Sequence, residues 1–127
     1  MDIRISNADS RPIYEQVSQQ IRQAILSGAL QEGELLPSIR ALAKDLRISV
    51  ITTKRAYEEL ERDGYVHSVA GKGFFVAPKD TGAVREDCLR RIERQMEEML
   101  RLAHTCGISV QELADMLRAL DREEESQ

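Results

Sequence analysis

Residues 38–64 read SIRALAKDLRISVITTKRAYEELERDG, and this stretch decides the fold. Apolar side chains recur at helical spacing over 39–46 and again over 50–63. Ser38 and Ser49 stand directly before the two runs, where N-cap residues are expected, and a glycine follows the second run. Two short helices joined by a tight bend predict a helix-turn-helix.

The segments on either side extend this prediction. Upstream, apolar residues at spacings of three and four predict a helix from Pro12 to Gly28. Downstream the apolar period changes to two, in YVHSV and FFVAP on either side of AGKG at 70–73. This pattern predicts a β-hairpin, and a hairpin directly after the second helix of a helix-turn-helix is the wing of a winged helix.

The C-terminal part is expected to be a two-helix dimerisation tail. Residues 79–82 form a predicted linker, because Pro, Gly and charged residues cluster around them. Beyond it, apolar residues at heptad spacing lie between charged ones, and Gly107 separates the two predicted helices. The residues expected to pair two chains are Leu89, Ile92, Met96, Met99, Ala103, Leu113, Leu117 and Leu120.

Composition limits the classes of function. A chain of 127 residues with 42% hydrophobic residues can form a small domain with an appendage, and this size does not favour a large catalytic fold. The net charge of −4 lies entirely in residues 79–127, whereas residues 1–78 hold equal numbers of acidic and basic side chains. Charge therefore leaves DNA binding open.

With no apolar run of about 20 residues and no signal peptide, we expect a cytoplasmic protein without membrane contact, whose two cysteines stay reduced.

No catalytic, cofactor or metal site is predicted. The two histidines, His67 and His104, lie on separate modules, and neither has a nucleophile and an orienting group nearby in the sequence. Glycine-rich phosphate-binding fingerprints do not occur. His104 and Cys106 are two residues apart on a predicted helix, so they point in opposite directions, and no CxxC pair or second histidine supports a metal site.

Several polar and basic residues are candidates for DNA contact. In a helix-turn-helix, the N-terminal turns of the second helix enter the major groove. In this sequence those turns present Ser49, Thr52, Lys54 and Arg55. Arg40 lies in the first turn of the preceding helix, where an anion is favoured. Gly71 allows a tight turn from which Lys72 projects. The alternative for the helix is a solvated face with two cations and no ligand.

The motifs PIYEQV, LPSIRALAKDL, TTKRAYEELERDGYV and GKGFFV, in this order, resemble the GntR family of bacterial transcription regulators over about residues 11–78. The short two-helix tail is similar to that of the YtrA-type subfamily. The resemblance implies a winged helix that binds operator DNA as a dimer, with contacts at Arg40, Thr52, Lys54, Gly71 and Lys72. The sequence departs from the family at Arg47, where the family usually has glycine, and at Val50 and Ile51, where it usually has polar residues.

The resulting interpretation is a mostly α chain with a winged helix-turn-helix in 1–78, a linker in 79–82 and a dimerisation tail in 83–127. We expect a homodimer that binds double-stranded DNA at an inverted repeat and regulates transcription, as a repressor more often than as an activator. A small-molecule effector is possible, although nothing in the sequence supports one. The alternative function is a protein interaction module with the same fold and no sequence-specific DNA binding.

Overall fold

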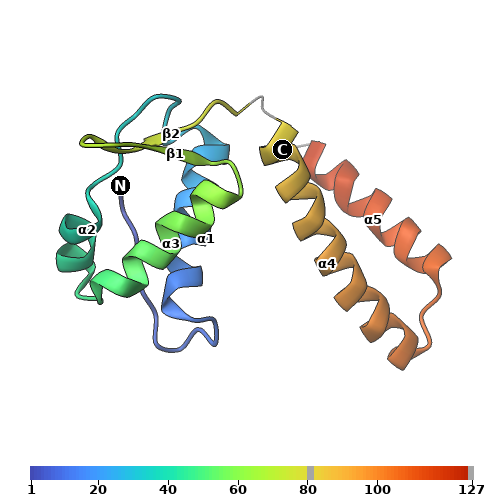
Figure 1. Cartoon of the computed structure of the whole chain (residues 1–127). Helices are drawn as coiled ribbons and strands as arrows, with labels where there is room; N and C mark the ends of the chain where they lie inside the picture. The colour runs from blue at the N-terminus through green and yellow to red at the C-terminus, as the bar shows by residue number, and fades with distance from the viewer. Residues whose placement is uncertain (80–81, 126–127) are drawn as a thin grey trace. The chain divides into compact units, whose positions relative to one another are not determined.

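The computed structural model describes residues 1–79 and 82–125. Along the chain lie α1 (Ile13–Ser27), α2 (Ile39–Leu46), α3 (Val50–Arg62), β1 (Val66–Val69), β2 (Gly73–Val76), α4 (Gly82–Cys106) and α5 (Val110–Glu125). They form two compact units, Met1–Asp87 and Cys88–Gln127. The described part is mostly helical, with a winged helix-turn-helix, a two-stranded hairpin as the wing and two C-terminal helices (Figure 1), so the predicted fold class is confirmed.

The helix ends follow the capping residues seen in the sequence. The hydroxyl of Ser38 accepts a hydrogen bond from the backbone N–H of Ala41 at the start of α2. Ser49 caps α3 in the same way. Gly28 ends α1 in the left-handed conformation, with φ of 87°, which glycine adopts without steric cost.

The core of the first unit lies where α1, α2 and α3 meet beneath the hairpin. Three residues one turn apart on α1 are fully buried, namely Val17, Ile21 and Ile25. Tyr57 of α3 is also buried, and its hydroxyl donates to the carbonyl oxygen of Pro37 at 2.7 Å. Its ring meets that of Phe74 in β2 edge to face, with 5.1 Å between the centroids. Tyr57 therefore fixes α3 against both the wing and the segment that leads into α2.

Both strands of the wing contact other parts of the first unit. β1 pairs with β2 in antiparallel register, and Leu35 forms a bridge to Phe75 on the other edge of β2. The segment around Leu35 thus lies along the outer edge of β2 as an additional partner of the hairpin. Near the end of α3, the Glu61 carboxylate accepts hydrogen bonds from the hydroxyl and the backbone N–H of Ser68, and these bonds lower the pKa of Glu61.

A buried charge cluster joins three helices of the first unit. Arg22 of α1 is only 2% exposed and forms ion pairs with Asp63 at 3.1 Å, Asp87 at 3.4 Å and Glu59 at 3.7 Å. The Tyr65 hydroxyl donates to Asp87 at 2.7 Å. Asp87 lies on α4, so the first unit includes the opening turns of a helix that the sequence analysis assigned wholly to the tail.

The second unit consists of the rest of α4 and of α5, which runs back in the opposite direction after Gly107 (Figure 1). The hydroxyl of Ser109 accepts from the N–H of Glu112 at the start of α5, which is the N-cap bond of a capping box. Many large apolar side chains of this unit are exposed: Leu89, Ile92, Met96, Met99, Leu102, Val110, Met116, Leu117 and Leu120. Among the described residues, no helix has the length and apolar character needed to span a membrane.

Candidate nucleic-acid interface

The first turn of α3 presents an ordered pair of hydroxyl groups. The Ser49 Oγ accepts from the Thr52 N–H at 3.0 Å and donates to the Thr52 Oγ1 at 2.7 Å. Since Thr52 uses its oxygen as an acceptor in this pair, its own hydroxyl hydrogen can be donated elsewhere. Ser49 acts mainly as the helix cap, whereas Thr52 offers a positioned donor at the end of α3 that would enter a groove.

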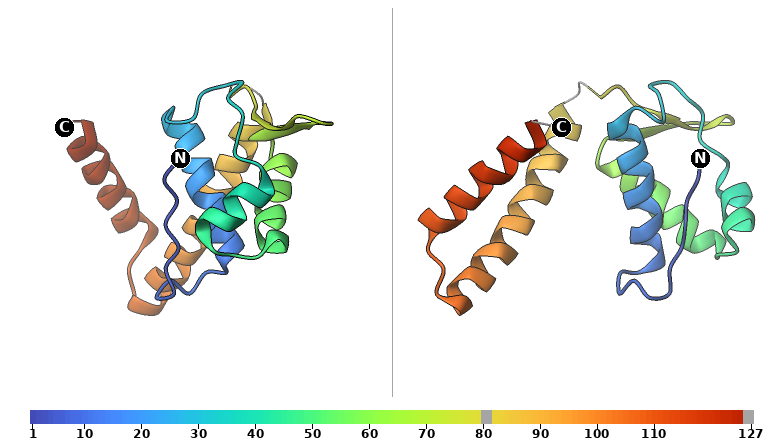
Figure 2. Two further views of the ribbon diagram at one scale, coloured as in Figure 1. Left: turned by 90° about the vertical axis from the view of Figure 1, so that its left-hand side faces the viewer. Right: turned by 180° about the vertical axis from the view of Figure 1, so that it is seen from behind.

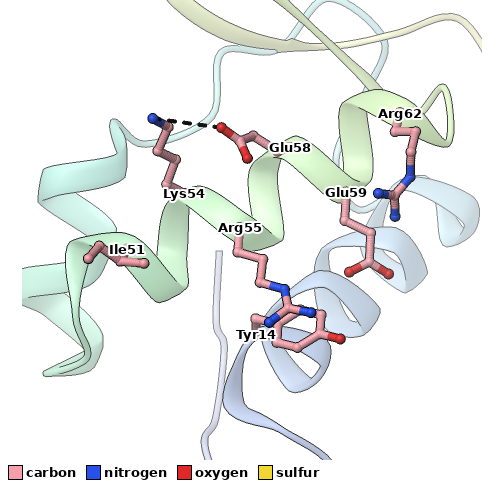
Figure 3. A pocket seen from close by; sticks show the side chains of 7 residues that line it. All are labelled: Tyr14, Ile51, Lys54, Arg55, Glu58, Glu59 and Arg62. Carbon is pink, nitrogen blue, oxygen red and sulfur yellow. Dashed lines mark ion pairs between the residues drawn. The ribbon is translucent and has the colours of Figure 1, made fainter.

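Two cationic side chains, Lys54 and Arg55, follow on the next turn, and each contacts another side chain of the protein (Figure 3). Lys54 forms an exposed ion pair with Glu58 at 3.8 Å. Such exposed pairs are weak, so a phosphate or a base can replace the carboxylate. The Arg55 guanidinium lies 3.8 Å from the centre of the Tyr14 ring. The cation–π contact orients Arg55 along the α1 side of α3.

These side chains border an open hollow on the surface of α3. Its lining consists of Tyr14, Ile51, Lys54, Arg55, Glu58, Glu59 and Arg62 (Figure 3). Lys54 and Arg55 lie in the N-terminal half of this lining, whereas Glu58 and Glu59 lie beside Arg62 in the C-terminal half. A polyanion would therefore be attracted most strongly to the N-terminal half of α3.

The remaining candidates lie on α2 and on the wing. Arg40 is exposed in the first turn of α2. Gly71 has φ of 77° in the turn between the strands, and Lys72 beside it is exposed. In Figure 1 the hairpin tip, α2 and the N-terminal end of α3 lie on the left-hand side of the first unit, and in the view from behind (Figure 2, right) all three lie on the right. The three predicted contact elements therefore share one side.

The structure brings only some of the candidate residues into contact. Ser49 and Thr52 touch each other, and Lys54 and Arg55 line the same hollow. Arg40 and Lys72 stand apart on their own elements. Tyr14 was not a candidate from the sequence alone, because its partner Arg55 is distant in sequence and lies on another helix.

Among the predicted tail residues, Ala103 is 3% exposed and Leu113 is partly buried, so the chain itself covers them. The other six are exposed. Leu102 and Met116 are exposed apolar residues that the predicted heptad positions left out. The heptad pattern alone does not separate side chains that the hairpin of α4 and α5 covers from those that it leaves in solvent.

Residues 13–76 match the family described as bacterial regulatory proteins, gntR family. The chain is 30% identical over 118 residues to the HTH-type transcriptional repressor YtrA of Bacillus subtilis, covering 93% of this chain and 91% of that protein. A crystal structure described as a transcriptional antiterminator from Listeria monocytogenes superimposes with a TM-score of 0.77 at 30% identity, covering 100% of this chain and 91% of the other.

A second solved structure is that of the AraR DNA-binding domain in complex with operator ORE1. Its TM-score is 0.52 at 27% identity, and the match covers 61% of this chain and 94% of the other. Within residues 1–79 and 82–125, no cluster of side chains suited to a metal ion occurs. The winged helix, the matched family pattern and the similarity to YtrA along nearly the whole chain lead to one conclusion. The chain belongs to the gntR family of bacterial regulatory proteins and is a DNA-binding transcriptional regulator, not an enzyme.

Proposed function

We propose that the protein is a homodimer that binds an inverted-repeat operator with sequence specificity and represses transcription. The observation that carries this proposal is the capped, exposed N-terminal turn of α3, with its oriented Thr52 hydroxyl and the cations that follow. Thr52 and Lys54 would contact base edges, and Arg55 would contact a base or the backbone. Ser49 would hold Thr52 in place.

Arg40 and Lys72 are proposed to bind phosphates on either side of the groove. Arg40 adds a cation to the positive end of α2, where backbone N–H groups already favour an anion. Lys72 follows Gly71 in the tight turn at the wing tip, and the left-handed backbone of Gly71 lets the cation approach the DNA. Contacts of this kind fix the protein on the duplex without reading its sequence.

The salt dependence of binding tests these anchors. We expect Arg40→Ala and Lys72→Ala to weaken binding to every DNA sequence alike. The slope of log K against log salt should become flatter by about 0.9 for each phosphate that the variant no longer binds, hence by about twice that in a dimer. Arg62→Ala is the matched control, since it removes an exposed cation from the far end of α3. An unchanged slope in either test variant would remove that residue from the interface.

The homodimer is supported by the exposed apolar side chains of α4 and α5. So many large apolar residues on one small unit indicate a surface that a partner covers. A second copy of the chain is the simplest partner, because a two-fold dimer would also place two α3 helices on one face of a duplex. Repression is proposed from the similarity to the repressor YtrA. It is tested by whether the protein lowers transcription in vitro from a promoter that overlaps its site.

A further inference from the structure

Ile51 is an apolar side chain in an unusual place. It lies in the first turn of α3, and 81% of its surface is exposed, more than for any other exposed large hydrophobic residue of the described chain. The tail's exposed apolar residues are accounted for by the proposed dimer, whereas Ile51 belongs to the other unit. Nothing in the described chain covers this side chain, although its position is the one that would face the DNA.

The neighbours of Ile51 define what it would meet. Lys54 is three residues further along the helix, so the two side chains share one face of α3, and both border the same hollow (Figure 3). Thr52 offers its hydroxyl hydrogen from the same turn. Ile51 therefore stands among the polar groups proposed to touch the floor of the major groove.

Only one of the four bases presents a methyl group on that floor. Guanine, cytosine and adenine present hydrogen-bond donors and acceptors in the major groove, whereas thymine also presents its C5-methyl group. An isoleucine against the polar edge of another base would remove water from that edge without replacing its hydrogen bonds, which is unfavourable. Against a thymine methyl, both partners withdraw apolar surface from water, which is favourable.

We propose that Ile51 reads a thymine in each half-site through its C5-methyl group. This inference rests on the proposed function, because it requires α3 to lie in the major groove of a specific site. It makes Ile51 a specificity-determining residue in addition to Thr52 and Lys54. It also explains why so exposed an apolar side chain stands in the turn of α3 that would face the bases.

The test removes single methyl groups from the DNA. A site is first selected with the wild-type protein from random duplexes, and each thymine is then replaced in turn by uracil, which differs only in lacking the C5-methyl group. At one symmetry-related pair of positions, the wild-type protein should lose about 4-fold in affinity per half-site, as expected for one buried methyl group. Ile51→Ala should bind the thymine site as weakly as wild type binds the uracil site, and should not distinguish the two.

Leu26→Ala is the control, since Leu26 is also an exposed large apolar residue but lies at the end of α1. This variant should keep the full difference between thymine and uracil. If wild type binds a selected site but no uracil replacement weakens it, or if Ile51→Ala keeps the difference, the assignment of Ile51 is wrong while the proposed function stands. If the wild-type protein selects no site at all, both fail.

Discussion

Arg47 forms the turn between α2 and α3 in a left-handed backbone conformation, with φ of 57°. Within the described chain it is the one residue other than glycine with a positive φ. The left-handed conformation costs an L-residue with a Cβ about 1–2 kcal/mol. This is the position at which the sequence departs from the glycine usual in the family, and glycine would adopt this conformation without that cost.

Replacing this residue measures the cost. We expect Arg47→Gly to raise the free energy of unfolding by about 0.5–1 kcal/mol, because the relief of strain exceeds the extra flexibility that glycine gives the unfolded chain. Arg47→Ala keeps the Cβ and should give no such gain. Urea titrations followed by circular dichroism compare the three proteins. A drop in stability in Arg47→Gly would mean that the arginine side chain itself stabilises the turn.

At the scale of the elements, local signals in the sequence were sufficient to predict the helices and the hairpin. Ser38, Ser49 and Gly28 mark helix ends through hydrogen bonds or backbone conformations that involve only neighbouring residues. The position of Thr52 beside Ser49 follows from the same cap, so this part of the candidate site was also predictable. Capping depends on residues close in sequence, and a single sequence is informative about those.

Contacts between distant elements could not be predicted in this way. Arg22 looks like a surface residue of an amphipathic helix, yet it is buried because three carboxylates from α3, its C-cap and α4 surround it. The pairing of Leu35 with Phe75 and the stacking of Arg55 on Tyr14 also depend on the tertiary fold. No local pattern in the sequence marks which charged side chain will find its partners far along the chain.

From the buried charge cluster we expect that substituting one acidic residue lowers the free energy of unfolding strongly, whereas substituting its neighbour leaves it nearly unchanged. Asp87→Ala removes a carboxylate from Arg22 and from the Tyr65 hydroxyl, and breaking a buried ion pair costs about 3–5 kcal/mol. Glu86→Ala, at the adjacent exposed position, should change the free energy of unfolding by less than about 0.5 kcal/mol. Denaturant titrations give both values. Equal effects of the two substitutions would show that the cluster does not stabilise the packing of the first turns of α4 within the first unit.

At the scale of the whole molecule, the proposed dimer would depend on the exposed apolar side chains of the second unit. Met96 and Met99 lie one turn apart on α4, and both are exposed. We expect the double substitution Met96→Asp and Met99→Asp to convert the dimer into a monomer, because it would place buried, unpaired carboxylates in the interface. Sedimentation equilibrium at micromolar concentration measures the mass.

The matched control is Arg94→Gln with Arg101→Gln, which changes the net charge by the same amount on the opposite face of α4. This control should remain dimeric. If the aspartate variant keeps the mass of two chains, or if the wild-type protein is itself a monomer, the assignment of the tail as the dimer interface is wrong.

The proposed function requires that two copies of the winged helix bind one symmetric DNA site with sequence specificity. The most direct measurement is selection of bound duplexes from a random DNA library by the full-length protein, followed by sequencing. We predict an inverted repeat whose half-site centres are about 10–10.5 base pairs, or a multiple of that, apart. Recovery of duplexes without any shared sequence, or of a single motif without a symmetric partner, would contradict the account.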